Sequence, residues 1–143
     1  MSDSTKAPDP LWAERTGART YTGHNGRGAS VRIGPEDADG VFSPGELLAI
    51  ALAGCTGMSA DSRVASELGD DVAITVGVTR TKDDGENRYP RLKVELVVDA
   101  SSLEPGRRER LEPAIVKAVE RLCTVSRTLE AGAAVDLVIS TEG

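Results

Sequence analysis

The feature that most constrains the fold is a long apolar stretch that opens with a helix-start signal. Ser43-Pro44-Gly45-Glu46 is a capping box with proline at the first helical position. The stretch runs to about Gly69, a residue type that suits a C-terminal cap. Its inward-facing residues follow steps of three and four: Leu48, Leu52, Cys55, Met58 and Ser59. Because the run is apolar nearly all round up to Met58, the pattern predicts a central, buried helix with Cys55 at its middle.

Small residues interrupt this predicted helix. Gly54 and Gly57 each cost about 1 kcal/mol relative to alanine in a helix interior. With Ala51, Ala53 and Ala60 they leave a groove narrow enough for another backbone to approach. Aromatic residues are only 3% of the chain, so the core must be built from Val, Leu, Ile and Ala. Such a core suits close helix packing or burial shared with a second subunit.

Alternating and valine-rich segments on both sides of the helix predict strands. Before the helix we expect one strand over 11–22, a turn over 23–28 and a partner strand over 29–33. After it we expect a hairpin of strands 70–81 and 91–101, a helix from Glu104 to Leu122, a short helical piece over 126–130 and a last strand over 133–140. The order is ββα–ββαβ, an α+β fold. It forms one domain over residues 11–143, after a flexible tail over residues 1–10.

Charge and hydropathy exclude several classes of function. The net charge of −6 would repel a phosphate backbone, so we expect no nucleic-acid partner. No stretch approaches the roughly 20 apolar residues of a membrane span, so we expect no membrane insertion. The polar, proline-containing start lacks the features of a secretory signal, which predicts a cytoplasmic protein.

Cys55 and Cys123 are the only two cysteines. In a reducing cytosol two thiols are not a disulfide framework, and with a single histidine they are too few for a usual structural zinc site. Two interpretations stay open at this point: a pair of buried, inert side chains, or a reactive thiol pair. A thiol buried in a helix has a raised pKa and is inert unless a positive group stabilises the thiolate.

Two motifs around these cysteines resemble those of the OsmC/Ohr family. Residues 44–55 are similar to the family's peroxidatic helix, whose pattern is P-E-x-L followed by small residues and cysteine. Cys123-Thr124-Val125-Ser126 is similar to its second motif, C-P-[VI]-S. Both motifs stand in the family's order, and the resemblance covers about residues 11–141.

The resemblance implies an intertwined homodimer in which antiparallel sheets from both chains wrap two central helices. It also implies active sites at the subunit interface. Cys55 matches the peroxidatic cysteine, whose sulfenic acid condenses with the resolving cysteine, matched by Cys123. A dithiol reductant such as a lipoylated protein then reopens the disulfide, and a second thiol nearby protects the first from over-oxidation.

The family's thiolate-stabilising arginine lies in the first hairpin, and Arg27 matches it best by its spacing to Val31. The alternatives are that Arg27 is a solvated turn residue, or that His24 in the same turn takes the role. The family's arginine-orienting glutamate usually stands where this chain has Gly45. Glu46 is the candidate to replace it, and its alternative role is the acid of the capping box.

The leading hypothesis is therefore a thiol-dependent peroxidase that reduces organic hydroperoxides without a metal or bound cofactor. Apolar residues around Cys55, namely Leu48, Ile50, Leu52 and Met58, favour alkyl hydroperoxides over hydrogen peroxide. Two other hypotheses stay open. One is a dimer that binds an apolar small molecule or senses redox state with little turnover, and the other is a structural dimer with two inert thiols.

Overall fold

The computed structural model describes residues 9–142. Residues 1–8 of the tail that we predict over residues 1–10 therefore lie outside the described residues. The chain divides into two compact units that meet in sequence between Leu48 and Ala49. Within the described residues no helix is both long and apolar enough to cross a membrane.

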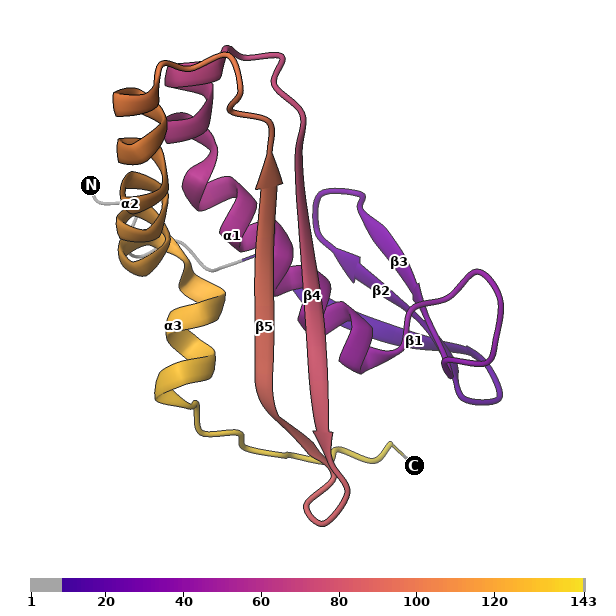
Figure 1. The fold of residues 1–143 in the computed structure, drawn as a ribbon. Helices are drawn as coiled ribbons and strands as arrows, with labels where there is room; N and C mark the ends of the chain where they lie inside the picture. The colour runs from indigo at the N-terminus through magenta and orange to yellow at the C-terminus, as the bar shows by residue number, and fades with distance from the viewer. Residues whose placement is uncertain (1–8, 143) are drawn as a thin grey trace, which may run out of the picture. The chain divides into compact units, whose positions relative to one another are not determined.

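The first unit is a three-stranded antiparallel sheet (Figure 1). Its strands are β1 (Leu11–Gly17), β2 (Thr20–Asn25) and β3 (Ser30–Ile33), in that order. The single strand predicted for residues 11–22 is wrong, because the chain reverses between Gly17 and Thr20. The two residues between them, Ala18 and Arg19, lack the Asn-Gly signal of a short hairpin turn.

The turn places the backbone of Arg19 in a strained conformation. Its φ is 56°, in the left-handed region that glycine and asparagine adopt most readily. An arginine there costs about 1 kcal/mol or more. The other described non-glycine residue with positive φ is Asn87, a residue type that tolerates the conformation.

Strand register places three side chains in one row across the first sheet. Arg15 is paired with Tyr21, and Tyr21 with Ile33. Because paired residues share a face of a sheet, these side chains lie side by side. Trp12 and His24, an odd number of residues away, stack on each other on the opposite face with ring centroids 5.2 Å apart.

The predicted long helix is confirmed as α1 (Pro44–Leu68). Its capping box is formed: the Ser43 N–H donates to Glu46 Oε1 at 2.8 Å, and the Glu46 N–H donates to Ser43 Oγ at 3.1 Å. Gly69, with φ of 94°, ends the helix by donating its N–H to the Ala65 carbonyl.

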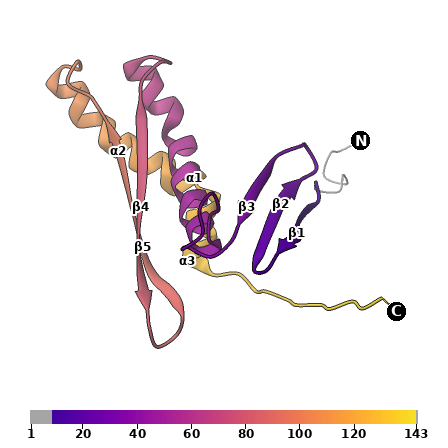
Figure 2. The same cartoon turned by 90° about the vertical axis from the view of Figure 1, so that its right-hand side faces the viewer.

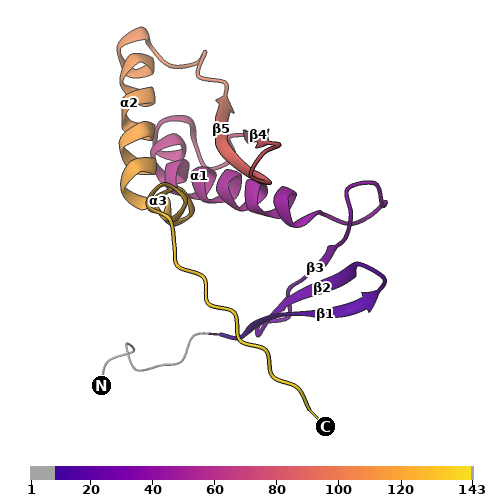
Figure 3. The ribbon, with the colours of Figure 1, turned by 90° about the horizontal axis from the view of Figure 1, so that it is seen from below.

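The second unit contains most of α1, the antiparallel hairpin of β4 (Ile74–Asp83) and β5 (Arg88–Val98), and the helices α2 (Pro105–Leu122) and α3 (Thr124–Ala131). The hairpin and both helices were predicted, although α3 is longer than expected. In Figures 1 and 3, α2 lies alongside the second half of α1, and an ion pair of Glu67 with Arg107 joins them. The buried hydrophobic residues are Ala49, Leu52, Ala60, Val64, Leu103, Leu111, Ala118 and Cys123.

The inward face of α1 differs from the predicted one. Leu52 and Ser59 are buried as expected, but Leu48 is 38% and Met58 is 82% exposed. The buried stripe instead passes through Ala49, Leu52, Thr56, Ala60 and Val64. These residues keep helical spacing, so the helix has one buried face. A second apolar face, which includes Met58, stays exposed among residues 9–142.

The last strand, predicted over residues 133–140, is wrong for the single chain. After Gly132 the chain runs extended with no strand pairing among the described residues (Figure 2). Val135, Leu137, Val138 and Ile139 are 90%, 84%, 83% and 76% exposed. A strand needs a hydrogen-bonding neighbour, and the described chain supplies none to this segment.

Candidate active site

The second unit brings Cys55 and Cys123 together. Cys55 lies mid-way along α1, and Cys123 is the junction between α2 and α3. Both thiols are free. Cys123 is completely buried, whereas Cys55 is partly exposed. The junction forms because Cys123 leaves helical geometry, with φ of −75° and ψ of 95°, while its N–H still bonds the Val119 carbonyl.

The start of α3 stabilises the Cys55 thiolate. The N–H of Val125 is the largest influence that lowers the pKa of Cys55, and partial burial opposes it. The Cys123 thiol, the Thr124 N–H and the Ser59 hydroxyl lower the pKa further. The first amides of a helix lack partners within it, and α3 has no side-chain cap. The Cys55 sulfur therefore acts as their acceptor, and the positive end of the helix favours its charge.

Cys123 is shifted in the opposite direction. Burial is the largest cause that raises the pKa of Cys123, and the neighbouring Cys55 raises it further through hydrogen bonding and charge. The N–H of Ser126 and the hydroxyl of Thr56 act against these effects. Over a range of pH, one sulfur is a thiolate while its neighbour is a protonated donor.

Sequence reasoning missed the groups that produce this difference. The expected stabiliser of the thiolate was a side-chain cation, whereas the main donors are the backbone amides of Val125 and Thr124. Ser59 is buried and donates to the Cys55 carbonyl at 2.7 Å. Its position one turn after Cys55 was the available signal, but the amides become donors only when α3 begins beside the thiol.

Thr124 supplies a donor that proline could not. Thr124→Pro should be tolerated by the fold, since proline is favoured at the first helical position. The substitution removes one N–H from the thiolate, so the pKa of Cys55 should rise and its alkylation by iodoacetamide at pH 7 should slow by up to about tenfold. Thr124→Ala, which keeps the N–H, should react like the wild type. Equal rates for the proline and alanine variants would show that this amide does not stabilise the thiolate.

Arg27 and Glu46 both lie in the first unit and already have partners. Arg27, in the turn between β2 and β3, pairs with Asp9 at 2.5 Å, and its side chain is 68% exposed. Glu46 accepts from the Ser43 N–H as the acid of the capping box. His24 lies in β2, not in the predicted turn, and stacks on Trp12. No group of three or more His, Cys, Asp or Glu residues able to hold a metal occurs within residues 9–142.

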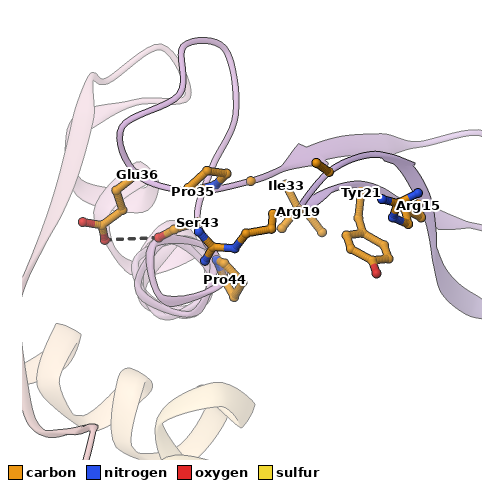
Figure 4. A pocket seen from close by; sticks show the side chains of 10 residues that line it. Arg15, Arg19, Tyr21, Ile33, Pro35, Glu36, Ser43 and Pro44 are labelled. Atoms are coloured by element: carbon orange, nitrogen blue, oxygen red, sulfur yellow. Dashed lines mark hydrogen bonds between the residues drawn. The ribbon is translucent and has the colours of Figure 1, made fainter.

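Two cavities of the structure are lined by neither cysteine. A groove of about 450 Å³ in the second unit is lined by Ile50, Ala53, Gly54, Gly57, Met58, Asp61, Ile74 and Val76. It confirms the predicted groove of small residues in part, through Ala53, Gly54 and Gly57. The first unit has a pocket of about 720 Å³ at the β1–β2 turn, whose labelled side chains are shown in Figure 4. Its two arginines, Arg15 and Arg19, were not singled out from the sequence.

A family model and a close relative both match most of the chain. The family model described as OsmC-like protein matches residues 36–138. An uncharacterized protein of Mycobacterium tuberculosis (strain ATCC 25618 / H37Rv) is 48% identical over 133 residues, which cover 93% of this chain and 97% of the relative.

Solved structures share the fold at low sequence identity. An OsmC-like protein from Mycoplasma pneumoniae has a TM-score of 0.66 at 14% identity, covering 88% of this chain and 89% of the other. The organic hydroperoxide resistance protein OhrB of Bacillus subtilis has a TM-score of 0.56 at 22% identity, covering 85% and 90%. These likenesses concern the mixed α+β fold with antiparallel sheets.

Proposed function

This chain belongs to the OsmC-like protein family, and from that premise we propose that it is a thiol-dependent peroxidase that reduces organic hydroperoxides. The observation that carries the proposal is the opposite shift in pKa of two neighbouring thiols at the start of α3. Such a pair contains both the nucleophile and the proton donor that two-cysteine chemistry needs.

The first step is attack by the Cys55 thiolate on the terminal oxygen of the hydroperoxide. The O–O bond breaks, the sulfur is oxidised to a sulfenic acid, and the organic part leaves as an alkoxide that takes a proton to become an alcohol. Donors at the start of α3 hold the thiolate partly exposed, where a hydroperoxide can reach it.

The second step uses Cys123. While Cys55 is charged, burial first and the charge of Cys55 second raise the pKa of Cys123 and favour its protonated form. Conversion of Cys55 to a neutral sulfenic acid removes that charge, which makes Cys123 easier to ionise. The Cys123 sulfur then displaces the sulfenic oxygen as water and forms the disulfide. A dithiol reductant, for which we propose a lipoylated protein, returns both thiols and becomes a disulfide itself.

Apolar side chains on α1 support an organic hydroperoxide as substrate. Met58, one turn after Cys55 on α1, lines the groove of the second unit with Ile50 and with Ile74 and Val76 of β4, although Cys55 itself is not in the lining. An alkyl chain gains about 0.8 kcal/mol for each buried CH₂ group, whereas hydrogen peroxide gains nothing from such a surface.

Arg27 and Glu46 complete the proposed site as the thiolate-stabilising cation and the acid that orients it. Because Arg27 is paired with Asp9, the ion pair must open before the guanidinium can serve the thiolate. Arg27→Gln should lower the second-order rate with cumene hydroperoxide about tenfold, and Asp9→Asn should raise it a few-fold.

Arg88 offers a matched control for Arg27. It also lies by a hairpin turn and pairs with an acidic neighbour, Glu86, at 2.5 Å. Arg88→Gln should leave the rate unchanged. If Arg27→Gln also leaves the rate unchanged, Arg27 is only a solvated turn residue and the α3 amides alone support the thiolate.

We further propose that the active form is a homodimer. The uncovered apolar face of α1 and the unpaired apolar segment after Gly132 both lack a covering element within the described chain. A second copy would supply both at once, because a two-fold interface presents the same surfaces on each subunit.

The direct test is a reaction of the reduced protein with one equivalent of cumene hydroperoxide. Loss of two hydrogens by intact mass, and a peptide that links Cys55 to Cys123, are expected within seconds to minutes. A protein that stays fully reduced while the peroxide persists would contradict the peroxidase and favour a ligand-binding or structural dimer.

A further inference from the structure

The buried face of α1 contains two hydroxyl groups, those of Thr56 and Ser59, among otherwise apolar side chains. Each of the two residues is 7% exposed. A buried hydroxyl without a hydrogen-bonding partner costs about 1–3 kcal/mol, and valine would fill the volume of a threonine without that cost. Both hydroxyls therefore need partners, and each of them acts on the sulfur of one cysteine.

The Ser59 hydroxyl already has an acceptor in the backbone. It donates to the Cys55 carbonyl, one turn earlier, at 2.7 Å. That carbonyl is the usual partner of a serine or threonine inside a helix. A hydroxyl has one proton to donate, so Ser59 can donate to the Cys55 sulfur only when it leaves the carbonyl.

The Thr56 hydroxyl has its proton available for a sulfur. Among residues 9–142 it forms no hydrogen bond to the Leu52 carbonyl, one turn earlier. Its partner is the Cys123 thiol. Burial is the main cause that raises the pKa of this thiol, and the Ser126 N–H and the Thr56 hydroxyl lower it. A donor stabilises the charged form of the group that accepts from it, so Thr56 favours the Cys123 thiolate.

Cys123 needs such donors because it is completely buried. Burial in apolar surroundings makes a thiol hard to ionise, and the thiolate is the form that attacks another sulfur. The charge that acts on Cys123 is that of the Cys55 thiolate, and it disappears when Cys55 becomes a sulfenic acid. The Ser126 N–H and the Thr56 hydroxyl then act against burial alone.

We propose that Thr56 is a catalytic residue of the second step, in which its hydroxyl donates a hydrogen bond to the Cys123 sulfur as that sulfur attacks Cys55. This role rests on the proposed peroxidase. The S–O bond of the sulfenic acid breaks, the S–S bond forms, and the Cys123 proton leaves with the oxygen as water. Thr56 keeps its own proton throughout. The helix α1 thus carries the sulfur that is attacked and, one residue later, a donor for the sulfur that attacks it.

Dithiobis(nitrobenzoate) tests this role without a peroxide. The Cys55 thiolate breaks the disulfide of the reagent, forms a mixed disulfide and releases one thionitrobenzoate anion. The Cys123 thiolate then attacks the Cys55 sulfur of this mixed disulfide and releases a second anion. Stopped-flow absorbance separates the two phases, because the rate of the first depends on reagent concentration and the rate of the second does not.

Thr56→Val should slow the second phase about tenfold at neutral pH, since a lost hydrogen bond to a charged group raises the pKa of Cys123. The midpoint of the pH profile of this phase should move about one unit to higher pH. Thr56→Ala should give the same result, whereas Thr56→Ser keeps the hydroxyl and should stay within about twofold of the wild type. The first phase should be the same in all four proteins.

Ser59→Ala is the matched control, because it removes the other buried hydroxyl of α1. It should slow the first phase and leave the second unchanged. The proposal is overturned if Thr56→Val keeps the wild-type second phase, if Ser59→Ala slows that phase as much, or if the phase slows without a shift of its midpoint. A wild type with a normal second phase that leaves cumene hydroperoxide unreduced would instead contradict the peroxidase, and Thr56 would remain the donor to Cys123 in disulfide formation.

Discussion

Replacement of Cys55 by serine is expected to abolish hydroperoxide consumption. A serine hydroxyl does not ionise near neutral pH, so the amides of Thr124 and Val125 would have no anion to stabilise and the O–O bond no nucleophile. We expect the rate to fall by at least about 10³-fold, to the level of peroxide in buffer. Consumption is measured by ferrous-xylenol orange assay with dithiothreitol or dihydrolipoamide as reductant.

Replacement of Cys123 by serine is the matched variant, because it removes the second thiol and keeps the first. It should consume one equivalent of peroxide to form the sulfenic acid on Cys55. No disulfide with a second thiol of the chain can then return Cys55 to its reduced form. With excess peroxide, intact mass should show two or three added oxygen atoms on Cys55, the sulfinic and sulfonic acids. Unchanged turnover in the Cys55→Ser protein would overturn the assignment of the nucleophile. Sustained peroxide consumption by the Cys123→Ser protein with no sulfinic acid formed on Cys55 would overturn the assignment of Cys123 as its partner.

Charged residues in the segment after Gly132 should prevent association of two chains. Leu137 and Ile139 are 84% and 76% exposed in the single chain, and each would gain about 1.5–3 kcal/mol if a second copy buried it. Leu137→Asp with Ile139→Asp should therefore weaken the dimer by at least about 100-fold in Kd, since both copies lose these contacts. Light scattering after size exclusion at micromolar concentration measures the change.

Ser140→Asp is the control for this experiment, because it adds a negative charge to the same segment at a polar position. It should remain dimeric and as active as the wild type. A wild-type protein that is monomeric at these concentrations, or a double variant that stays dimeric, would contradict the proposed homodimer without affecting the test on Cys55.

The helices and the second hairpin could be predicted because their signals are local. The capping box around Ser43, the glycine at position 69 and the start of α2 near Pro105 all act within one or two turns of the chain. The strands β4 and β5 alternate over enough residues to show their two faces.

The wrong predictions concern elements whose local sequence signal is weak or whose formation depends on a distant partner. The two central residues of the first turn, Ala18 and Arg19, are neither glycine nor asparagine, so the pattern of residues 11–22 predicts one strand. The segment 133–140 has the composition of a strand, but composition cannot provide the neighbour that a strand requires.

The sequence by itself therefore determined the mixed α+β class, the long helix that carries Cys55 and the placement of Cys123 at the end of the next helix. The tertiary structure alone decided that the two thiols are neighbours with opposite pKa shifts, because the responsible donors are the uncapped amides at the start of α3. Backbone amides are the same for every residue except proline. They stabilise a thiolate only when the fold places several of them, at the positive end of their helix, next to one sulfur.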